Sequence, residues 1–292
     1  MRATGTAVAA AWMAGAIASF STIAIAARAL SPAFGTLELM LFRSAIGFAV
    51  VALVLAARGR LSVARPRRMG LHALRNIVHF AGQNLWFAAL TMLPLAQVFA
   101  LEFTSPLWVI LLAPLLLDER PTRRMVGGGL VGFAGVLLVV RPDLGGLLHP
   151  GILAGLGCSV SFAVTAMLTR KLTRTEPVGA VLFWLNAMQL AFSAGLVGVG
   201  GGWPIPSAAQ LPWVLAIGAA GLAAHWCLTS ALDAAPASVV MPMDFLRLPA
   251  IAVVGWALYG EPLDAPVFVG AALILGGNAL ALRPRALPGP QP

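Results

Sequence analysis

Residues 94–117 read PLAQVFALEFTSPLWVILLAPLLL, and residues 236–259, which lie 142 positions later, read PASVVMPMDFLRLPAIAVVGWALY. Each stretch begins with proline and is apolar over most of its length. Each also carries one acidic residue at the same place, Glu102 in the first and Asp244 in the second. A helix needs about 20 apolar residues to cross the hydrocarbon core of a bilayer. Both stretches are therefore predicted to be transmembrane helices, and their common register indicates an internal duplication.

The composition of the whole chain is typical of a membrane protein. Of its 292 residues, 60% are apolar and 10% are charged, whereas soluble domains carry about 25% charged residues. The net charge of +9 has a topological cause, given below, so we predict no nucleic-acid partner. Cys158 and Cys227 lie within apolar stretches and form no disulfide or metal-binding pattern. We therefore expect no metal and no cofactor.

Ten apolar stretches long enough to span a bilayer occur along the chain, joined by short loops. They cover residues 6–28, 36–57, 73–92, 94–117, 125–141, 150–170, 178–198, 211–232, 236–259 and 266–282. The first stretch is too long for the apolar region of a signal peptide, so we expect it to be a retained helix. The sequence predicts an all-α integral membrane protein with ten transmembrane helices.

The basic residues test this count independently, because cytoplasmic loops of membrane proteins are enriched in Lys and Arg. With a cytoplasmic N-terminus, 15 of the 19 Lys and Arg residues fall on the cytoplasmic side. Only Arg28 and Arg141 fall outside, and Arg43 and Arg247 fall within spans. A miscounted helix would reverse every later loop and destroy this asymmetry. We therefore expect both termini in the cytoplasm and the protein in the inner membrane.

The offset of 142 residues extends over both halves of the chain. Between residues 88 and 142, 12 of 55 positions are identical to the residue 142 positions later, against roughly five expected by chance. The predicted domains are residues 1–142 and 143–284, followed by a short disordered cytoplasmic tail at 285–292. Each half has five spans, an odd number, so the second half must be inverted. Inverted repeats are common in secondary transporters, which bind substrate near the midplane between the repeats; a duplication that only built a scaffold is the alternative.

Several motifs resemble the EamA half-repeat of the drug/metabolite transporter superfamily. They are LFR at 41–43, LEFTSPLW at 101–108, LDERP at 117–121, GFAGVLL at 132–138, APAS at 235–238, YGEP at 259–262 and the segment from Gly270 to Gly277. The resemblance covers essentially the whole chain. It implies ten helices, cytoplasmic termini and the transport of small metabolites. It leaves the substrate open, because members of the family move amino acids, nucleotide-like molecules, vitamins and sugars.

Charged residues inside the spans are candidate functional residues, because a charge at mid-helix costs about 2.5–3.5 kcal/mol on insertion. Arg43 and Glu102 lie at similar depths, so we predict an ion pair between them, with Glu38 near the outer mouth. Asp244 and Arg247 are three residues apart and share a helix face, so they could pair or face a cavity together. The three acids could also carry protons. No uncommitted acid shares the depth of Arg247, so this residue is predicted to bind a carboxylate or phosphate of the substrate.

Polar residues at positions related by the repeat complete the predicted site. Gln83 and His225 form one such pair near the midplane, and Ser19 and Ser161 form another. Trp108 could line the same cavity or face lipid. The predicted substrate-binding set is Arg247, Asp244, Gln83, His225, Ser19, Ser161 and Trp108.

These features predict a secondary transporter that moves a small polar or amphipathic metabolite, such as an amino acid, by alternating access, with export as the main expectation. Uptake of a vitamin or nucleoside-like metabolite is the alternative. The sequence has no Gly-x-x-x-x-Gly-Lys-Ser/Thr motif, so direct use of ATP is not expected. It also lacks the nucleophile, metal and filter motifs of a membrane-embedded enzyme or a channel. The expected partners are a small-molecule substrate, the lipid bilayer and protons, and the expected state is a monomer or homodimer.

Overall fold

A computed structural model of the protein describes residues 2–116, 122–141, 148–173, 175–234, 243–244 and 246–282. The predicted tail at 285–292 lies outside these residues. Within the described ranges the chain is helical, with one short 3-10 turn, η1 (Leu61–Ala64). The α-helices are α1 (Arg2–Leu30), α2 (Thr36–Ala57), α3 (Met69–Met92), α4 (Leu95–Glu102), α5 (Ser105–Leu116), α6 (Arg123–Val140), α7 (Pro150–Thr173), α8 (Val178–Val199), α9 (Leu211–Ala234), α11 (Arg247–Tyr259) and α12 (Ala265–Leu282).

The helix boundaries repeat with the same offset as the sequence. Moving α2, α3 and α6 forward by 142 residues gives both bounds of α8, α9 and α12, and the start of α5 likewise gives the start of α11. Among the described residues each half therefore contributes five helical segments, with α4 and α5 counted as one broken segment. The prediction of an all-helical membrane protein with ten helices in two halves is confirmed.

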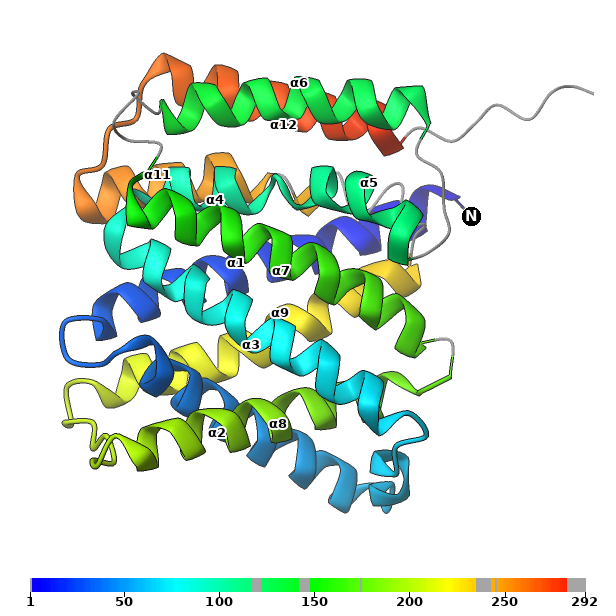
Figure 1. Cartoon of the computed structure of the whole chain (residues 1–292), viewed down its shortest axis with the longest axis vertical. Helices are drawn as coiled ribbons and strands as arrows, with labels where there is room; N and C mark the ends of the chain where they lie inside the picture. Colours follow the sequence, from blue (N-terminus) through cyan, green and yellow to red (C-terminus); the bar gives the residue numbers. More distant parts are fainter. Residues whose placement is uncertain are drawn as a thin grey trace, which may run out of the picture.

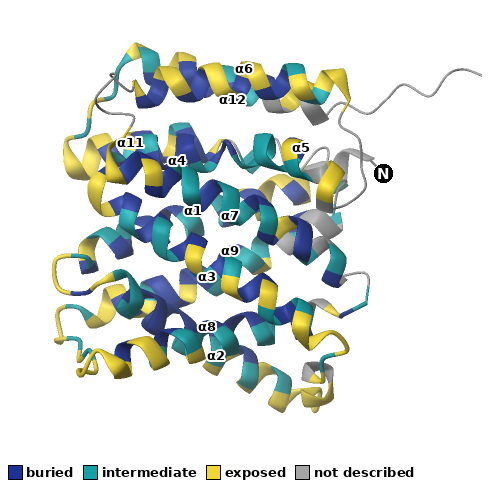
Figure 2. Cartoon of the chain, viewed as in Figure 1, coloured by how far each residue is buried: buried dark blue, intermediate teal, exposed yellow. Residues whose placement is uncertain are grey.

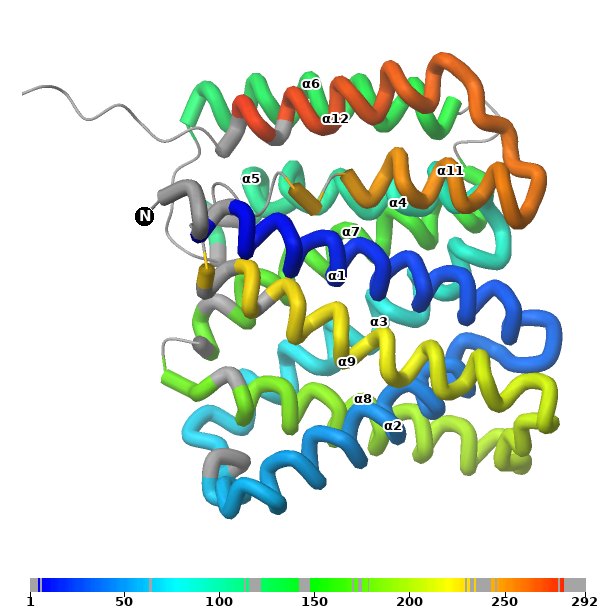
Figure 3. The backbone as a smooth tube through the Cα atoms, turned by 180° about the vertical axis from the view of Figure 1, so that it is seen from behind, coloured from blue at the N-terminus to red at the C-terminus, as the bar shows by residue number. Residues whose placement is uncertain are grey.

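The halves pack as an inverted repeat requires, in layers along the longest axis of the bundle (Figure 1). α6 runs beside α12 at one end of the bundle, and α2 packs on α8 at the other. Between them α1 packs along α9 and α3 along α7, and the view from behind shows α1 and α9 side by side (Figure 3). Each contact thus joins either equivalent helices or the first helix of one half to the third helix of the other.

Most of the described helices suit a bilayer. Seven helical segments are long and apolar enough to cross one, and α11 and α12 contribute shorter apolar helices. α3 has 24 residues but is not among the seven, because its histidine, arginine, asparagine and glutamine residues lower its mean hydropathy. The polar residues of α3 belong to the site described below.

The polarity of the bundle is reversed relative to that of a water-soluble protein. Exposed residues occupy the outer faces and the loops, whereas buried residues gather between the helices (Figure 2). Large apolar side chains such as Leu53, Leu115 and Val199 are 70%, 77% and 89% exposed. Arg43 and Gln189, in contrast, are buried. Such a surface is stable against lipid tails, and its buried polar residues mark functional candidates.

The helix predicted at 94–117 is broken near its middle. α4 ends at Glu102 and α5 begins at Ser105, with two residues of turn between them. Pro106 explains the break, because it has no N–H for the carbonyl of Glu102 and its ring clashes with that carbonyl in a continuous helix. In the second half α11 begins at Arg247, the position equivalent to Ser105. Both halves therefore start a helix inside the membrane next to an acidic residue, as transporters with discontinuous helices do.

α6 and α12 approach each other closely because both present glycine where they meet. A Cβ atom on Gly135 would lie 2.5 Å from the carbonyl oxygen of Gly270, and one on Gly270 would lie 2.6 Å from that of Gly135. Gly277 meets the α6 backbone at Gly128 and Gly132. Small residues allow such backbone contact in lipid, where helices associate mainly by close packing.

Replacing Gly135 with alanine should lower the melting temperature of the detergent-solubilised protein, because the new methyl group must push two helices apart. Overpacking of this kind costs about 1–3 kcal/mol. Gly127 lies on the same helix and has open space where its Cβ would be. Gly127→Ala is therefore the matched control and should not lower the melting temperature. If Gly135→Ala melts at the wild-type temperature, α6 and α12 do not meet as described.

Candidate functional site

The long helices of the bundle begin and end at two opposite edges. The start of α1 lies at one edge (Figure 1), with the start of α3 and the ends of α7 and α9. We call this the N-terminal edge. The opposite edge holds the ends of α1 and α3, and we call it the Arg28 edge after the residue in the last turn of α1.

A cavity of about 450 Å³ lies between the two halves. Its walls come from α1 to α4 in the first half and from α7, α9 and α11 in the second. Several of its lining residues are related to one another by the offset of 142. These pairs are Phe20 with Phe162, Ile23 with Thr165, Gln83 with His225, and Trp86 with Leu228. The cavity therefore lies on the axis that relates the halves, where transporters with inverted repeats bind substrate.

An ion cluster joins the halves in the wall of this cavity. Nη2 of Arg247 donates to Oε1 of Glu102 over 3.0 Å and to Oδ2 of Asp244 over 3.1 Å. The other oxygen of Glu102 accepts a hydrogen bond of 2.8 Å from the indole Nε1 of Trp86. The guanidinium carbon of Arg247 lies 4.5 Å from the ring centre of Phe20, close enough for a cation–π interaction. The end of α4 and the start of α11 thus meet at the two helix breaks.

This cluster corrects two predictions. Glu102 pairs with Arg247 and not with Arg43, because the break at the end of α4 brings its carboxylate to the start of α11. The prediction that no uncommitted acid shares the depth of Arg247 is also wrong, since Glu102 pairs with it. Its contact with Asp244 is one of the two arrangements expected for that residue pair. The protein itself therefore neutralises the charge of Arg247.

Several buried polar atoms in the cavity wall have no hydrogen-bond partner in the described part of the chain. They are Nε of Arg43, both ring nitrogens of His79 and Oγ1 of Thr165. Buried polar groups are nearly always hydrogen-bonded, and leaving one unsatisfied costs about 1–3 kcal/mol. Their gathering around one cavity indicates a place where a polar ligand or water completes their hydrogen bonds.

Aromatic rings form much of the remaining wall. Phe20, Trp86 and Phe162 all line the cavity, and the ring of His79 lies 5.8 Å from that of Phe162 at a tilt of 35°. Aromatic faces and edges pack well against flat rings. The cavity therefore combines surfaces for a planar ligand with unsatisfied hydrogen-bonding groups.

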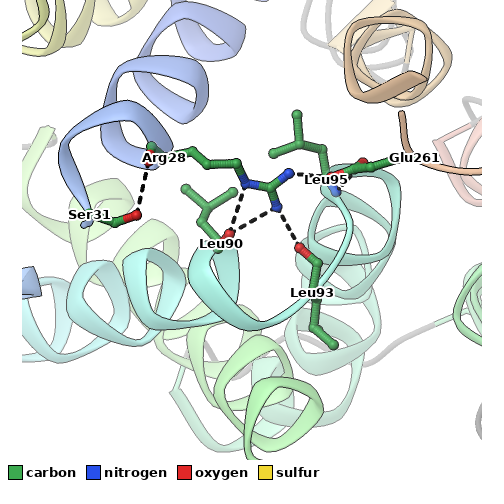
Figure 4. A network of polar contacts seen from close by, with 6 residues as sticks. All are labelled: Arg28, Ser31, Leu90, Leu93, Leu95 and Glu261. Carbon is green, nitrogen blue, oxygen red and sulfur yellow. Dashed lines mark hydrogen bonds and ion pairs between the residues drawn. The ribbon is translucent and has the colours of Figure 1, made fainter. Parts of the chain in front are cut away.

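A polar network ties the helix ends together at the Arg28 edge (Figure 4). Arg28 donates to the carbonyl of Leu90 over 3.1 and 2.9 Å and to that of Leu93 over 2.5 Å. It also forms an ion pair with Glu261, which accepts a 2.8 Å hydrogen bond from the backbone N–H of Leu95. These bonds satisfy backbone groups that helix ends leave free. They hold α1, α3 and α4 to the link between α11 and α12.

The cavity extends from the centre of the bundle toward the N-terminal edge. Arg75 lies six residues after the start of α3, which is about 9 Å along the helix. Thr169 lies four residues before the end of α7. Both residues line the cavity, so its lining reaches within about two turns of that edge.

Comparison with known proteins gives the family. Residues 7–141 and residues 149–283 each match the EamA-like transporter family. The chain belongs to the EamA-like transporter family. It is therefore a transporter and not an enzyme.

Individual relatives of this transporter match most of its length. It is 30% identical over 238 residues to a riboflavin transporter of Rhizobium johnstonii, covering 81% of this chain and 78% of that one. It is 28% identical over 269 residues to a riboflavin transporter of Vibrio cholerae, covering 90% and 89%. It is 24% identical over 218 residues to an S-adenosylmethionine uptake transporter of Rickettsia felis, covering 75% and 72%. A crystal structure with 24% identity superposes with a TM-score of 0.67 over 96% of this chain and 97% of that one, which shows the same fold.

The structure places some predicted site residues of the transporter on the cavity and others elsewhere. Gln83 and His225 line it, and their contact with substrate stays a prediction. Glu38 instead caps α2, because its Oε2 accepts a 2.6 Å hydrogen bond from the backbone N–H of Gly35. A role for Glu38 at an outer mouth therefore has no support in its contacts.

Three further predicted residues lie apart from the described lining of the cavity. Trp108 lines a separate apolar groove formed by α5, α6 and α7. Ser161 donates to the carbonyl of Gly157 within its own helix over 2.9 Å. Ser19 is half-buried. A binding role for these three residues stays a prediction.

A polar stripe on α3 extends the site beyond Gln83, which is the one residue of this stripe in the predicted binding set. His72, Arg75, Asn76, His79 and Gln83 recur every three or four residues, so they share one helix face, and all five are buried. The charge sorting treats Arg75 as a cytoplasmic residue at the end of a span, but its side chain is 6% exposed. The spacing of polar residues within one predicted span was the signal that could have identified this face.

Replacing Arg247 with methionine should strongly destabilise the transporter, because Glu102 and Asp244 would lose their positive partner. Removing one member of a buried ion pair costs about 3–5 kcal/mol, which a lower melting temperature of the purified protein would report. Arg141→Gln is the control, since its ion pair with Asp264 is 47% and 40% exposed. Exposed pairs contribute about 0–1 kcal/mol, so this variant should melt close to wild type.

Adding Glu102→Gln and Asp244→Asn to Arg247→Met should recover part of the lost stability, because the buried negative charges are then gone as well. A triple variant that melts below Arg247→Met would show that Arg247 is not the counter-charge of both acids.

Proposed function

We propose that this transporter takes up a vitamin or nucleoside-like metabolite across the inner membrane by alternating access. The relatives described above are named for riboflavin and S-adenosylmethionine, and both compounds contain a flat heteroaromatic ring. The observation that carries the proposal is the central cavity, whose lining combines the rings of Phe20, Trp86 and Phe162 with polar groups that have no partner among the described residues.

The size of the cavity also favours a vitamin or nucleoside-like substrate over an amino acid. Pockets for drug-sized ligands measure about 300–1,000 Å³, and this cavity measures about 450 Å³. A small amino acid would leave much of the aromatic wall without contact. The name of the S-adenosylmethionine uptake transporter likewise supports uptake more than export.

Alternating access requires that the two edges open in turn. The Arg28 edge is held by the network around Arg28 and Glu261. At the N-terminal edge Glu176 accepts hydrogen bonds of 2.6 and 2.9 Å from the backbone N–H groups of Arg67 and Arg68. We infer that the halves rock about the central ion cluster and release one network at a time.

The orientation follows from the distribution of basic residues. The N-terminal edge carries the arginines of the link between α2 and α3, so we assign it to the cytoplasm. Glu102 and Asp244 are the candidates for proton coupling, because both acids lie at the helix breaks between the halves.

Proteoliposomes that contain the purified protein should show saturable uptake of labelled riboflavin that is accelerated by unlabelled riboflavin inside. Ala166 lines the cavity, so Ala166→Phe should fill part of it and reduce the uptake rate by about tenfold or more. A tenfold change corresponds to a free-energy difference of about 1.4 kcal/mol. Leu153→Phe on the same helix is the matched control, because Leu153 is 50% exposed and is not among the described lining residues of the cavity. Uptake by this variant should equal that of wild type.

Two results would overturn this proposal. The first is the absence of saturable uptake or counterflow for flavins and for nucleosides. The second is an equal loss of uptake in Ala166→Phe and Leu153→Phe, which would show that the cavity is not the transport path.

A further inference from the structure

We propose that Arg43 and Arg75 together bind an anionic group of the transported metabolite. Both residues line the central cavity, and they are 5% and 6% exposed. Neither forms an ion pair with a carboxylate within the described ranges of the chain. The inference rests on the proposed function, because it assigns one part of the same cavity to one chemical group of the substrate.

The described acids that could neutralise these arginines are engaged elsewhere. Glu102 and Asp244 bind Arg247, and Glu176 and Glu261 belong to the networks at the two edges. The described residues thus leave two positive charges in the cavity wall without a counter-charge. Burying a charge is costly unless it is paired, so a bound anion would stabilise this wall.

The guanidinium of Arg75 is held in position by neutral groups. Its Nε donates to Oγ1 of Thr169 over 3.1 Å, and its Nη1 donates to Oδ1 of Asn76 over 3.0 Å. Asn76 is itself held by a 2.8 Å hydrogen bond to the carbonyl of His72. These bonds orient the group and do not neutralise its charge. A preorganised guanidinium loses less conformational entropy when it binds a carboxylate or phosphate.

Arg43 reaches the same cavity from α2. Its Nε has no partner among the described residues, and it lies beside Gly221, where a Cβ atom would be 3.0 Å from that nitrogen. Arg43 and Arg75 repel each other, so an anion bound to both would also relieve this repulsion. Oγ1 of Thr165 and the ring nitrogens of His79 also have no partner among the described residues. The Thr165 hydroxyl and an N–H of His79 could donate hydrogen bonds to the remaining oxygens of a phosphate or carboxylate.

The substrate class that fits both the aromatic rings and the two arginines of the cavity is a flat heteroaromatic compound that carries a carboxylate or a phosphate. The ring would pack on Phe20, Trp86 and Phe162, and the anion would bind Arg43 and Arg75. Riboflavin is neutral and has no such group. A transporter with this anion site should therefore prefer the anionic compound, whereas a carrier for a neutral vitamin should not.

The test compares probes that differ by one phosphate: riboflavin with flavin mononucleotide, and adenosine with adenosine monophosphate. Their affinities for the purified full-length protein are measured by tryptophan fluorescence and by thermal shift. In at least one pair we expect the phosphorylated member to bind about tenfold or more tightly than the neutral one. Arg43→Gln and Arg75→Gln should each remove most of this preference, because each deletes one of the two positive charges that would bind the phosphate. Arg141→Gln, whose ion pair is exposed, should keep the preference.

The wild-type comparison needs no substitution, so the inference is tested even if a glutamine variant fails to fold. Equal or tighter binding of the neutral member in both pairs would overturn it, and so would the absence of binding by all four probes at about 1 mM. Riboflavin transport without a preference for flavin mononucleotide would overturn the anion site and leave the proposed function standing. A preference for phosphorylated probes without transport in proteoliposomes would overturn the proposed function and leave the anion site standing.

Discussion

The ion cluster of Arg247 with Glu102 and Asp244 is the interaction on which the rest of the transporter depends. It lies where α4 ends and α11 begins, which is where two helix breaks leave backbone polar groups and charges inside the membrane. The rings of Phe99 and Phe103 each lie 5.0 Å from the guanidinium carbon of Arg247. Because removing one partner of a buried ion pair is strongly destabilising, the cluster ties the halves to each other at the point about which we propose that they rock.

The lining of the cavity beside this cluster includes apolar residues related by the internal repeat and arginines that are not so related. Its aromatic and apolar pairs come from equivalent positions of the two halves. Its arginines do not: the positions equivalent to Arg43 and Arg75 are Leu185 and Ile217. The duplication therefore accounts for where the cavity lies, and divergence of the two copies accounts for its positive charge. This difference explains why the internal repeat predicts a place of binding but leaves the substrate open.

Hydropathy and the repeat predicted the helices and their register well, because both depend on the chain's local sequence. The partner of Glu102 could not be predicted in the same way. The depth of Glu102 along a straight helix led to the prediction that Arg43 is its partner, although Pro106 in the sequence indicated a break in that helix. Arg75 was assigned to the membrane boundary because the predicted span begins at residue 73, four residues after α3 begins. Contacts between the halves depend on the packing of helices that are distant in the chain, which no local pattern contains.

The polar stripe of α3 also bears on how the protein is made. α3 packs on α7, which begins at Pro150, long after α3 ends at Met92. During synthesis α3 therefore enters the bilayer with its polar face uncovered, and each polar residue in lipid raises the free energy of insertion. α1 likewise packs on α9 from the other half. Because α7 belongs to the second half, biogenesis must keep the polar face of α3 protected or hydrated until α7 has been inserted beside it.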